Sequence, residues 1–340
     1  MSETGRRRPD EMWDADVGVV GAGYAGLAAA LFLRRHRVSV VVFDGGPTRN
    51  HVATEVHGYL GLPSASATEL IAVGRGQVEE LGGRIEACRI ERAEVVEDGF
   101  RLAGVDNAGS DGAEPDVAGS DAAESDGAGS GDAEWRVRRL LLATGVRDLL
   151  PDIARLDEFY GRSVHVCPHC DGYEWRDQPI AVISWNDAAR DFVSKVSHWS
   201  RDVTLVSDGR RPELSAEDRA WLRSKGIALR TATIQSFEGD DGRLDGLRLV
   251  DGDLLPAAAA FFSIGEEHQT GLAKQLDCRL DDSGAIDVDD EQHTSVEGVW
   301  AAGDVAGDSQ FVAIAAAHGV KAALDIHRTL ATREPERHPA

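Results

Sequence analysis

The chain has 340 residues, of which 42% are hydrophobic, so its length fits about two domains with buried cores. Its formal net charge is −23, which argues against nucleic acid and anionic membranes as partners. No segment has the apolar length of a membrane span or a signal peptide, and we expect a globular, cytoplasmic protein with the acidic surface typical of a halophile.

The first predicted structural unit follows a charged N-terminal tail over residues 1–13. An apolar run over 16–20, a helical stretch over 27–35 and a β-branched run over 38–43 predict a strand, a helix and a second strand. This β-α-β order is typical of the start of a dinucleotide-binding domain.

The turn between this strand and helix has the sequence GAGYAG, from Gly21 to Gly26. Gly21 allows the tight turn, Gly23 lets the backbone approach a pyrophosphate, and Gly26 lets the helix pack on the strand. Asp44 closes the second strand, where an acid accepts hydrogen bonds from the adenosine ribose. We therefore predict a bound dinucleotide at this turn.

An acidic repeat separates two further predicted strands, over 99–105 and 135–143. It repeats every ten residues and contains almost no large apolar side chains. Because such a segment buries too little surface to offset its chain entropy, we predict that 106–134 is a disordered acidic loop.

A second β-α-β pattern lies in the middle of the chain. Residues 180–184, 187–199 and 203–206 predict a strand, a helix and a strand. Strands near 261–264 and 298–302 are expected to return to the first domain. The predicted fold class is α/β, with two doubly wound, Rossmann-like dinucleotide-binding domains, the second inserted into the first.

These patterns set the expected domain boundaries. The first domain is expected to be discontinuous, over 14–152 and 263–330, and the second to cover 153–262. Residues 331–340 are expected to form a C-terminal tail.

The run CPHCDGY, from Cys167 to Tyr173, lies in the second predicted domain. Its two cysteines, Cys167 and Cys170, can close a small disulfide ring, and the acid that follows, Asp171, can carry a proton. A zinc site is the alternative, but the sequence has no second CxxC pair, and we expect no metal.

Four motifs in this order resemble the low-molecular-weight thioredoxin reductases and their relatives, which are FAD-dependent pyridine nucleotide-disulfide oxidoreductases. They are GAGYAG at 21–26, LLLATG at 140–145, CPHCDGY at 167–173 and VWAAGDVAG at 299–307. The resemblance implies bound FAD and a homodimer. It also implies a thioredoxin-like protein, or a small thiol or disulfide, as the substrate.

The resemblance assigns roles within the dithiol run. It implies that Cys170 lies against the flavin, that Cys167 attacks the substrate disulfide, and that Asp171 gives a proton to the leaving thiolate. The cofactor-binding residues that the glycine pattern and the resemblance imply are Gly21, Ala22, Gly23, Gly26, Asp44, Ala143, Thr144, Gly145, Gly303, Asp304 and Gln310. The stretch that begins at Gln310, Gln-Phe-Val-Ala, departs from the Arg-Gln-Ala of the family, so contacts to the flavin ring are left open there.

One histidine, His57, belongs to a stretch that is similar to one passing near the flavin in related flavoproteins. The similar residues are Arg49-Asn50 and His57-Gly58-Tyr59. His57 could be a catalytic base or could make structural hydrogen bonds, and we expect the structural role.

The second β-α-β departs from the family at its turn. Residues 180–189 have no glycine at the three positions of the fingerprint, and Trp185 puts bulk where a pyrophosphate approaches backbone N–H groups. The paired arginines that read a 2′-phosphate are also displaced, since three residues separate Val206 from Arg210. NADPH binding is therefore left open.

Three functions fit these motifs. The first, which we predict, is a disulfide reductase that receives electrons from NADPH or from another donor such as a ferredoxin or a deazaflavin. The second is an oxygen-dependent dithiol oxidase that runs from a substrate dithiol to FAD to oxygen. The third is a non-enzymatic flavin redox sensor. Asp171 favours the first function, and the lost glycines favour the second.

Overall fold

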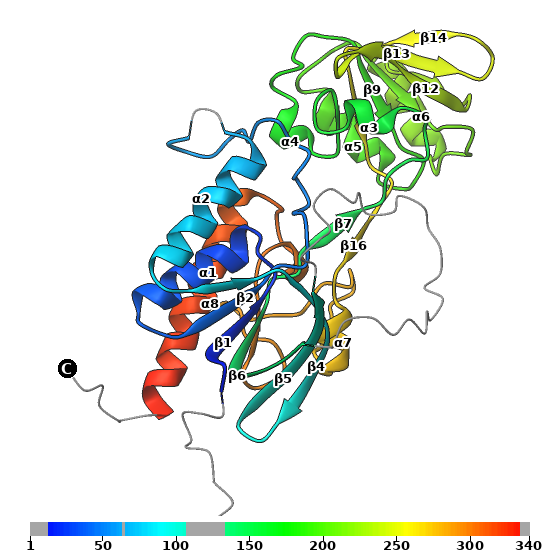
Figure 1. Cartoon of the computed structure of the whole chain (residues 1–340). Helices are drawn as coiled ribbons and strands as arrows, with labels where there is room; N and C mark the ends of the chain where they lie inside the picture. Colours follow the sequence, from blue (N-terminus) through cyan, green and yellow to red (C-terminus); the bar gives the residue numbers. More distant parts are fainter. Residues whose placement is uncertain (1–12, 63–64, 107–132, 334–340) are drawn as a thin grey trace, which may run out of the picture. The chain divides into compact units, whose positions relative to one another are not determined.

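The computed structural model of the chain describes residues 13–62, 65–106 and 133–333. Most of the predicted acidic loop and of the two predicted tails lies outside these residues. The chain divides into two compact units (Figure 1). Strands β7 (Val146–Asp148) and β16 (Glu266–His268) pair with each other where the chain passes between the units.

The first unit takes in the chain up to Arg49, residues Thr68–Arg147 and the chain from His268. Its described sheet has seven strands in the order β3-β2-β1-β6-β5-β4, with β17 beside β6. The strands are β1 (Ala15–Val20), β2 (Val40–Phe43), β3 (Arg84–Glu86), β4 (Cys88–Val96), β5 (Gly99–Asp106), β6 (Ala133–Leu142) and β17 (Val299–Ala301). The pairs around β1 are parallel, whereas β4, β5 and β6 pair in antiparallel.

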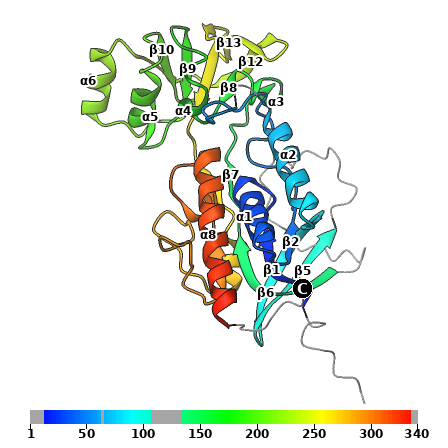
Figure 2. The ribbon, with the colours of Figure 1, turned by 90° about the vertical axis from the view of Figure 1, so that its left-hand side faces the viewer.

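Helices α1 (Tyr24–Arg35) and α8 (Val312–Arg333) lie side by side and pack against this sheet (Figures 1 and 2). Their close approach depends on Gly319, because an added Cβ there would lie 2.0 Å from the carbonyl oxygen of Ala25. The described part of the unit also contains α2 (Ala67–Glu80), α7 (Gly271–Gln275) and the 3₁₀ helix η2 (Asp304–Ala306).

The second unit takes in Asn50–Ala67 and Asp148–Glu267. Its parallel sheet has the order β11-β10-β9-β15-β8, and an antiparallel sheet has the order β12-β13-β14. The strands are β8 (Val164–His165), β9 (Ile180–Ile183), β10 (Val203–Val206), β11 (Ala228–Arg230), β12 (Ile234–Asp240), β13 (Arg243–Leu249), β14 (Leu254–Pro256) and β15 (Ala259–Phe262). The helices are α3 (Leu156–Phe159), α4 (Pro168–Asp171), α5 (Ala189–Val196) and α6 (Ala216–Ser224).

The predicted fold class is confirmed: two α/β units are each built on a parallel β-α-β core, and the second interrupts the first. The two strands predicted around the acidic segment form the antiparallel pair β5 and β6. The strand predicted near 298–302 is β17 of the first sheet.

The strand predicted near 261–264 was assigned to the wrong sheet. It is β15, which pairs in parallel with β9 and β8 inside the second unit. The reason is packing, because Ala259 and Phe261 are buried in one apolar cluster with Val182 of β9.

The segment before α2 also differs from the predicted boundaries, since residues 50–67 belong to the second unit. The Thr54 N–H donates to the Gly161 carbonyl oxygen at 3.5 Å. Gly161 has φ +76°, and an added Cβ there would lie 2.5 Å from the Val52 carbonyl oxygen. This close backbone contact ties the segment to the unit that carries the dithiol.

We predict that Gly319→Ala lowers the free energy of unfolding by about 1–3 kcal/mol, because the new methyl group overlaps the α1 backbone. The matched control is Gly76→Ala in α2, where an added Cβ has no atom within 4 Å. Because alanine favours helix over glycine, this control should stabilise the protein by about 0.5–1 kcal/mol. Urea unfolding followed by circular dichroism measures both, and equal stability of the two variants would contradict the packing argument.

Candidate functional site

The glycine turn after β1 has open space for a ligand beside one of its three glycines. At the other two, neighbouring backbone atoms lie so close that no side chain fits. Gly21 has φ +113°, and an added Cβ would lie 2.1 Å from the Ala143 carbonyl oxygen. At Gly26 the added Cβ would lie 1.9 Å from the Gly21 carbonyl oxygen. At Gly23 the nearest atom is the Thr48 methyl group at 3.9 Å, so the space beside this backbone is open. The turn therefore fits the close approach of a pyrophosphate to Gly23.

The first turn of α1 supports the same interpretation. Gly23 is the N-cap of α1 and, as a glycine, contributes no side-chain hydrogen bond to the backbone N–H groups of the first turn. Because these groups and the helix dipole attract an anion, the pyrophosphate of FAD fits this end of α1.

The predicted cofactor residues of the first unit lie at one edge of its sheet. In the parallel register, Val20 at the end of β1 pairs with Phe43 and Leu142, and Leu142 pairs with Ala301. The residues that follow these strand ends therefore meet at the carboxyl edge, where dinucleotides bind in doubly wound sheets. They are Gly21 to Gly26, Asp44, Ala143 to Gly145, and Gly303 with Asp304.

Arg49 connects two of the predicted residues. Its Nη1 lies 3.5 Å from Asp304 Oδ2 and donates a hydrogen bond to Gln310 Oε1. The sequence indicated Arg49 only through a resemblance and did not predict its contact with Asp304, because 255 positions separate the two residues. Arg49 thus connects Gln310 to Asp304 of the motif at 299–307, although the residues that follow Gln310 depart from the family.

Arg75 of α2 is a residue that sequence reasoning missed. It forms an ion pair with Asp44, whose other oxygen accepts a hydrogen bond from the Gly46 N–H at 3.1 Å. The acid predicted to bind ribose is therefore held in place by Arg75 and the backbone of Gly46. Arg75 lies in none of the sequence motifs, so nothing in the sequence signalled this contact.

Thr144, whose role in cofactor binding stays a prediction, has a contact within the protein. Its hydroxyl donates to the Gln269 carbonyl oxygen at 2.7 Å, and the Gln269 N–H donates to the Gly145 carbonyl oxygen at 3.0 Å. The Ala-Thr-Gly turn is thus fastened to the chain that follows β16.

The dithiol forms a disulfide between Cys167 and Cys170, with the two Cα atoms 5.3 Å apart. Cys167 is the N-cap of the short helix α4, and Pro168 follows it at the first helical position, where proline is favoured. The Cys170 N–H lies 3.1 Å from both the carbonyl oxygen and the Sγ of Cys167. The turn that closes the disulfide is therefore built into the CxxC sequence.

Asp171 lies at the end of the same turn, with its side chain 20% exposed. Burial raises the pKa of its carboxyl group to about 7, the charge of His57 opposes this rise, and Glu174 adds to it. A carboxyl group with a pKa near neutrality can donate and accept a proton under physiological conditions.

Two residues near Asp171 were given no role in proton transfer from the sequence, which suggested His165 only as a ligand of the alternative zinc site. The Nδ1 atom of His165 lies 3.4 Å from Asp171 Oδ2, and the Trp175 indole N–H donates to His165 Nε2 at 3.0 Å. His165 is 7% exposed, and its position two residues before Cys167 was the only signal that could have drawn attention to it.

His57 is in the second unit with the dithiol. Its Nδ1 lies 3.8 Å from Glu174 Oε1 and its Nε2 lies 3.8 Å from Glu55 Oε2. These ion-pair distances fit the structural role that we expected, and a role as a base stays a hypothesis.

The turn after β9, where the family has its second glycine fingerprint, is held by side chains. The Ser184 hydroxyl donates to the Ser263 carbonyl oxygen at 2.8 Å, and the Asn186 amide donates to the same oxygen at 3.2 Å. The guanidinium of Arg210 stacks on the Trp185 ring at 3.9 Å. Five residues separate the end of β9 at Ile183 from the start of α5 at Ala189.

The residues after β10, where a second dinucleotide site would contact the ribose, also have partners within the protein. Asp208 accepts the Ile234 N–H at 2.8 Å with one oxygen and binds Arg210 at 3.0 Å with the other. Because Arg210 is also stacked on Trp185, the turn and its nearest arginine do not fit an ordinary NADPH site.

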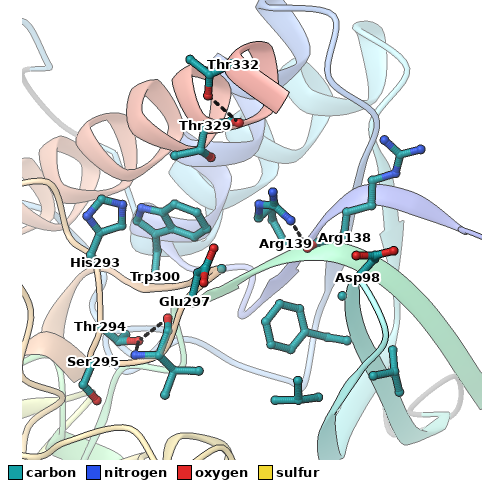
Figure 3. Close-up of a pocket in the computed structure, with 16 residues that line it drawn as sticks. Asp98, Arg138, Arg139, His293, Thr294, Ser295, Glu297, Trp300, Thr329 and Thr332 are labelled. Atoms are coloured by element: carbon teal, nitrogen blue, oxygen red, sulfur yellow. Dashed lines mark hydrogen bonds between the residues drawn. The ribbon is translucent and has the colours of Figure 1, made fainter. Parts of the chain in front are cut away.

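A cavity of about 710 Å³ lies elsewhere in the first unit (Figure 3). It adjoins the segment before β17, whereas Gly303 and Asp304 follow the other end of that strand. His293, which lines it, lies 2.6 Å from Asp325 Oδ2 and 3.0 Å from Asp289 Oδ2. We assign no ligand to this cavity.

Two features are absent from the residues that the structure describes. No helix in this part of the chain is long and apolar enough to cross a membrane. Within the same residues, no group of three or more His, Cys, Asp or Glu side chains could hold a metal ion.

Known proteins share this arrangement along nearly the whole chain. The sequence pattern of the family described as "Pyridine nucleotide-disulphide oxidoreductase" matches residues 15–319. A thioredoxin reductase of Streptomyces coelicolor is 30% identical over 335 residues, which cover 94% of this chain and 95% of that protein. The thioredoxin reductase tcpT of Claviceps purpurea is 30% identical over 298 residues, which cover 85% of this chain and 86% of that protein.

A solved structure agrees with these sequence relatives. The crystal structure of a putative thioredoxin reductase, TrxB, from Bacillus anthracis superposes with a TM-score of 0.80 at 27% identity. The match covers 94% of this chain and 99% of that one. With its dinucleotide turn and its CxxC disulfide, the chain belongs to the pyridine nucleotide-disulphide oxidoreductase family and is a thioredoxin reductase-like flavoprotein disulfide oxidoreductase.

Proposed function

We propose that the protein passes electron pairs between FAD and a thiol or disulfide substrate through Cys167 and Cys170, with Asp171 as the proton carrier. The observation that carries the proposal is the disulfide within one turn of α4, next to a carboxyl group whose pKa is raised to about 7. Bound FAD would supply the two-electron chemistry. The chain supplies the sulfur exchange and the proton.

The two sulfur atoms have different tasks in this proposal. In the reductive direction, the reduced pair has a free thiolate on Cys167, which attacks one sulfur of the substrate disulfide and releases its other sulfur as a thiolate. Cys170 then attacks Cys167, which closes the protein disulfide and releases the second substrate sulfur. Two electrons leave the protein, and two protons are needed to convert both released thiolates into thiols.

Asp171 provides one of these protons. Below a pH of about 7 its carboxyl group is protonated and can donate, and above that pH it is ionised and can only accept. Solvent returns the proton after each turnover. The acid therefore serves the reductive direction at lower pH and the oxidative direction at higher pH.

The substrate is a thioredoxin-like protein or a small thiol or disulfide. The names of the sequence relatives, which are thioredoxin reductases, support the protein substrate. The homodimer, the cytoplasmic location and the halophilic source stay predictions.

The electron donor is the point at which the proposal departs from the relatives. The turn at Trp185 has no glycine, is stacked by Arg210, and has Asp187 and Asp191 near the start of α5. These carboxylates would repel a pyrophosphate. This turn therefore favours a reductase that receives its electrons from a donor other than NADPH bound in the usual place.

A second candidate follows from the same observation. An oxygen-dependent dithiol oxidase takes electrons from a substrate dithiol and gives them to oxygen, so it needs no nicotinamide site. The occupied turn favours this candidate, whereas Asp171 favours the reductase, although its carboxylate can also accept a proton in the oxidative direction. A non-enzymatic redox sensor is the least supported function, because a disulfide and a titrating acid lie side by side.

We predict that Asp171→Asn slows disulfide reduction by about 10²-fold and removes the pH dependence centred near 7. Anaerobically reduced holoenzyme is mixed with bis(2-hydroxyethyl) disulfide, and the return of flavin absorbance is followed at several pH values. In the unmodified protein the rate should fall as the pH rises through about 7, because the donating acid is lost.

The matched control for this experiment is Asp177→Asn, which removes the same charge from an exposed position six residues away. It should leave both the rate and the pH profile unchanged. A normal rate in Asp171→Asn would remove this carboxyl group from the mechanism.

We also predict that neither NADPH nor NADH bleaches the flavin rapidly in anaerobic stopped-flow mixing at high salt. Dithiothreitol should bleach it through the cysteine pair, and a variant with serine at positions 167 and 170 should not respond to the dithiol. Rapid, saturable bleaching by either nucleotide would establish a pyridine nucleotide-dependent reductase despite the turn. Fast reoxidation of the dithiol-reduced flavin by air would favour the oxidase.

A further inference from the structure

His165 is a buried polar residue beside the proposed proton carrier, and the sulfur exchange does not itself use it. It ends β8, and its imidazole ring lies 5.4 Å from the Phe261 ring of β15 and 6.1 Å from the Trp175 ring, measured between centroids. Its fractional exposure is 7%. The strand and the two aromatic rings therefore hold the imidazole in one place.

The contact with Trp175 determines which nitrogen of the ring carries the proton. An indole N–H can only donate, and it lies 3.0 Å from His165 Nε2. Nε2 must therefore accept, which leaves the proton of the neutral ring on Nδ1. Burial lowers the pKa of His165 to about 4, with a further contribution from the charge of His57, and so keeps the ring neutral at physiological pH.

The protonated nitrogen lies near Asp171. Nδ1 lies 3.4 Å from Asp171 Oδ2, and the ring is also hydrogen-bonded to the backbone of Arg162, which competes with Asp171 for the Nδ1 proton. A contact of this length can shorten when the acceptor gains charge, since hydrogen bonds of catalytic groups tighten during the reaction. A neutral donor that faces the carboxyl group stabilises the carboxylate more than the acid.

We propose that His165 is a positioning residue for Asp171, and that its Nδ1–H, oriented by Trp175, stabilises the carboxylate left after proton transfer. His165 keeps its own proton throughout, and the transferred proton moves only between Asp171 and the substrate sulfur. The inference rests on the proposed function, because it presumes that Asp171 carries the proton.

Other charged groups also face Asp171 and enter the test. His57, from the segment over 50–67, lowers its pKa, and Glu174, from the turn after α4, raises it. Both are kept unchanged in every variant. His57 has Glu55 and Glu174 within 3.8 Å, so its own charge depends on those acids.

The experiment compares His165→Leu with His165→Asn in the holoenzyme, using the reduction of bis(2-hydroxyethyl) disulfide across the pH range. Because His165→Leu lacks the donor, the descending limb of its rate profile should move to higher pH by about one unit or more. The rate on the low-pH plateau should fall about tenfold. The asparagine amide can take the place of Nδ1–H, so His165→Asn should restore much of both. Trp175→Phe should give an intermediate shift, because the ring can then exchange its proton between the two nitrogens.

The double variant with Asp171→Asn separates positioning from folding. If His165 acts through Asp171, His165→Leu should have no further effect when Asp171 is already asparagine. An equal loss in that background, or an unshifted profile in His165→Leu alone, would overturn the inference. If Asp171→Asn itself leaves exchange unchanged, the proposed function and the inference fail together, whereas an effect of Asp171 without one of His165 removes only the inference.

Discussion

The burial of one carboxyl group beside a disulfide is the constraint on which the proposed chemistry of this protein depends. Breaking a disulfide with an electron pair produces thiolates, which need protons, and a fully exposed aspartate is ionised at neutral pH and has none to give. Because Asp171 is taken out of water at the end of α4, its pKa rises to about 7. The same short turn thus holds the sulfur atoms and the proton, and Phe261 of β15 packs against the histidine that faces the acid.

The two β-α-β turns of the chain are stabilised in different ways. After β1, three glycines keep side chains away from the backbone, and helix α1 begins close to the strand end. After β9, Ser184 and Asn186 fill the equivalent place with hydrogen bonds, and Trp185 lies under Arg210. One unit therefore keeps the features of a dinucleotide site, while the other keeps the fold and uses it to support the dithiol.

The sequence predicted those features whose geometry is local. A glycine fingerprint and a CxxC turn each lie within a few residues, so Gly21, Gly26 and the cysteine pair could be assigned before the fold was known. Contacts between distant segments could not, and Arg49 with Asp304, 255 positions apart, is the example. The apolar run at β15 would fit either sheet, because periodicity does not say which neighbour buries it. His165 was missed for a third reason, since only the arrangement of Trp175 and Asp171 around its ring distinguishes it from an ordinary buried histidine.

The central claim is that the cysteine pair and the flavin form one electron-accepting system. An anaerobic titration of the holoenzyme with dithionite, followed by flavin absorbance and thiol content, tests it directly. The disulfide and the flavin each accept an electron pair, so the unmodified protein should take up twice as many electrons per flavin as a variant with serine at positions 167 and 170. Equal uptake by the two proteins would contradict the account.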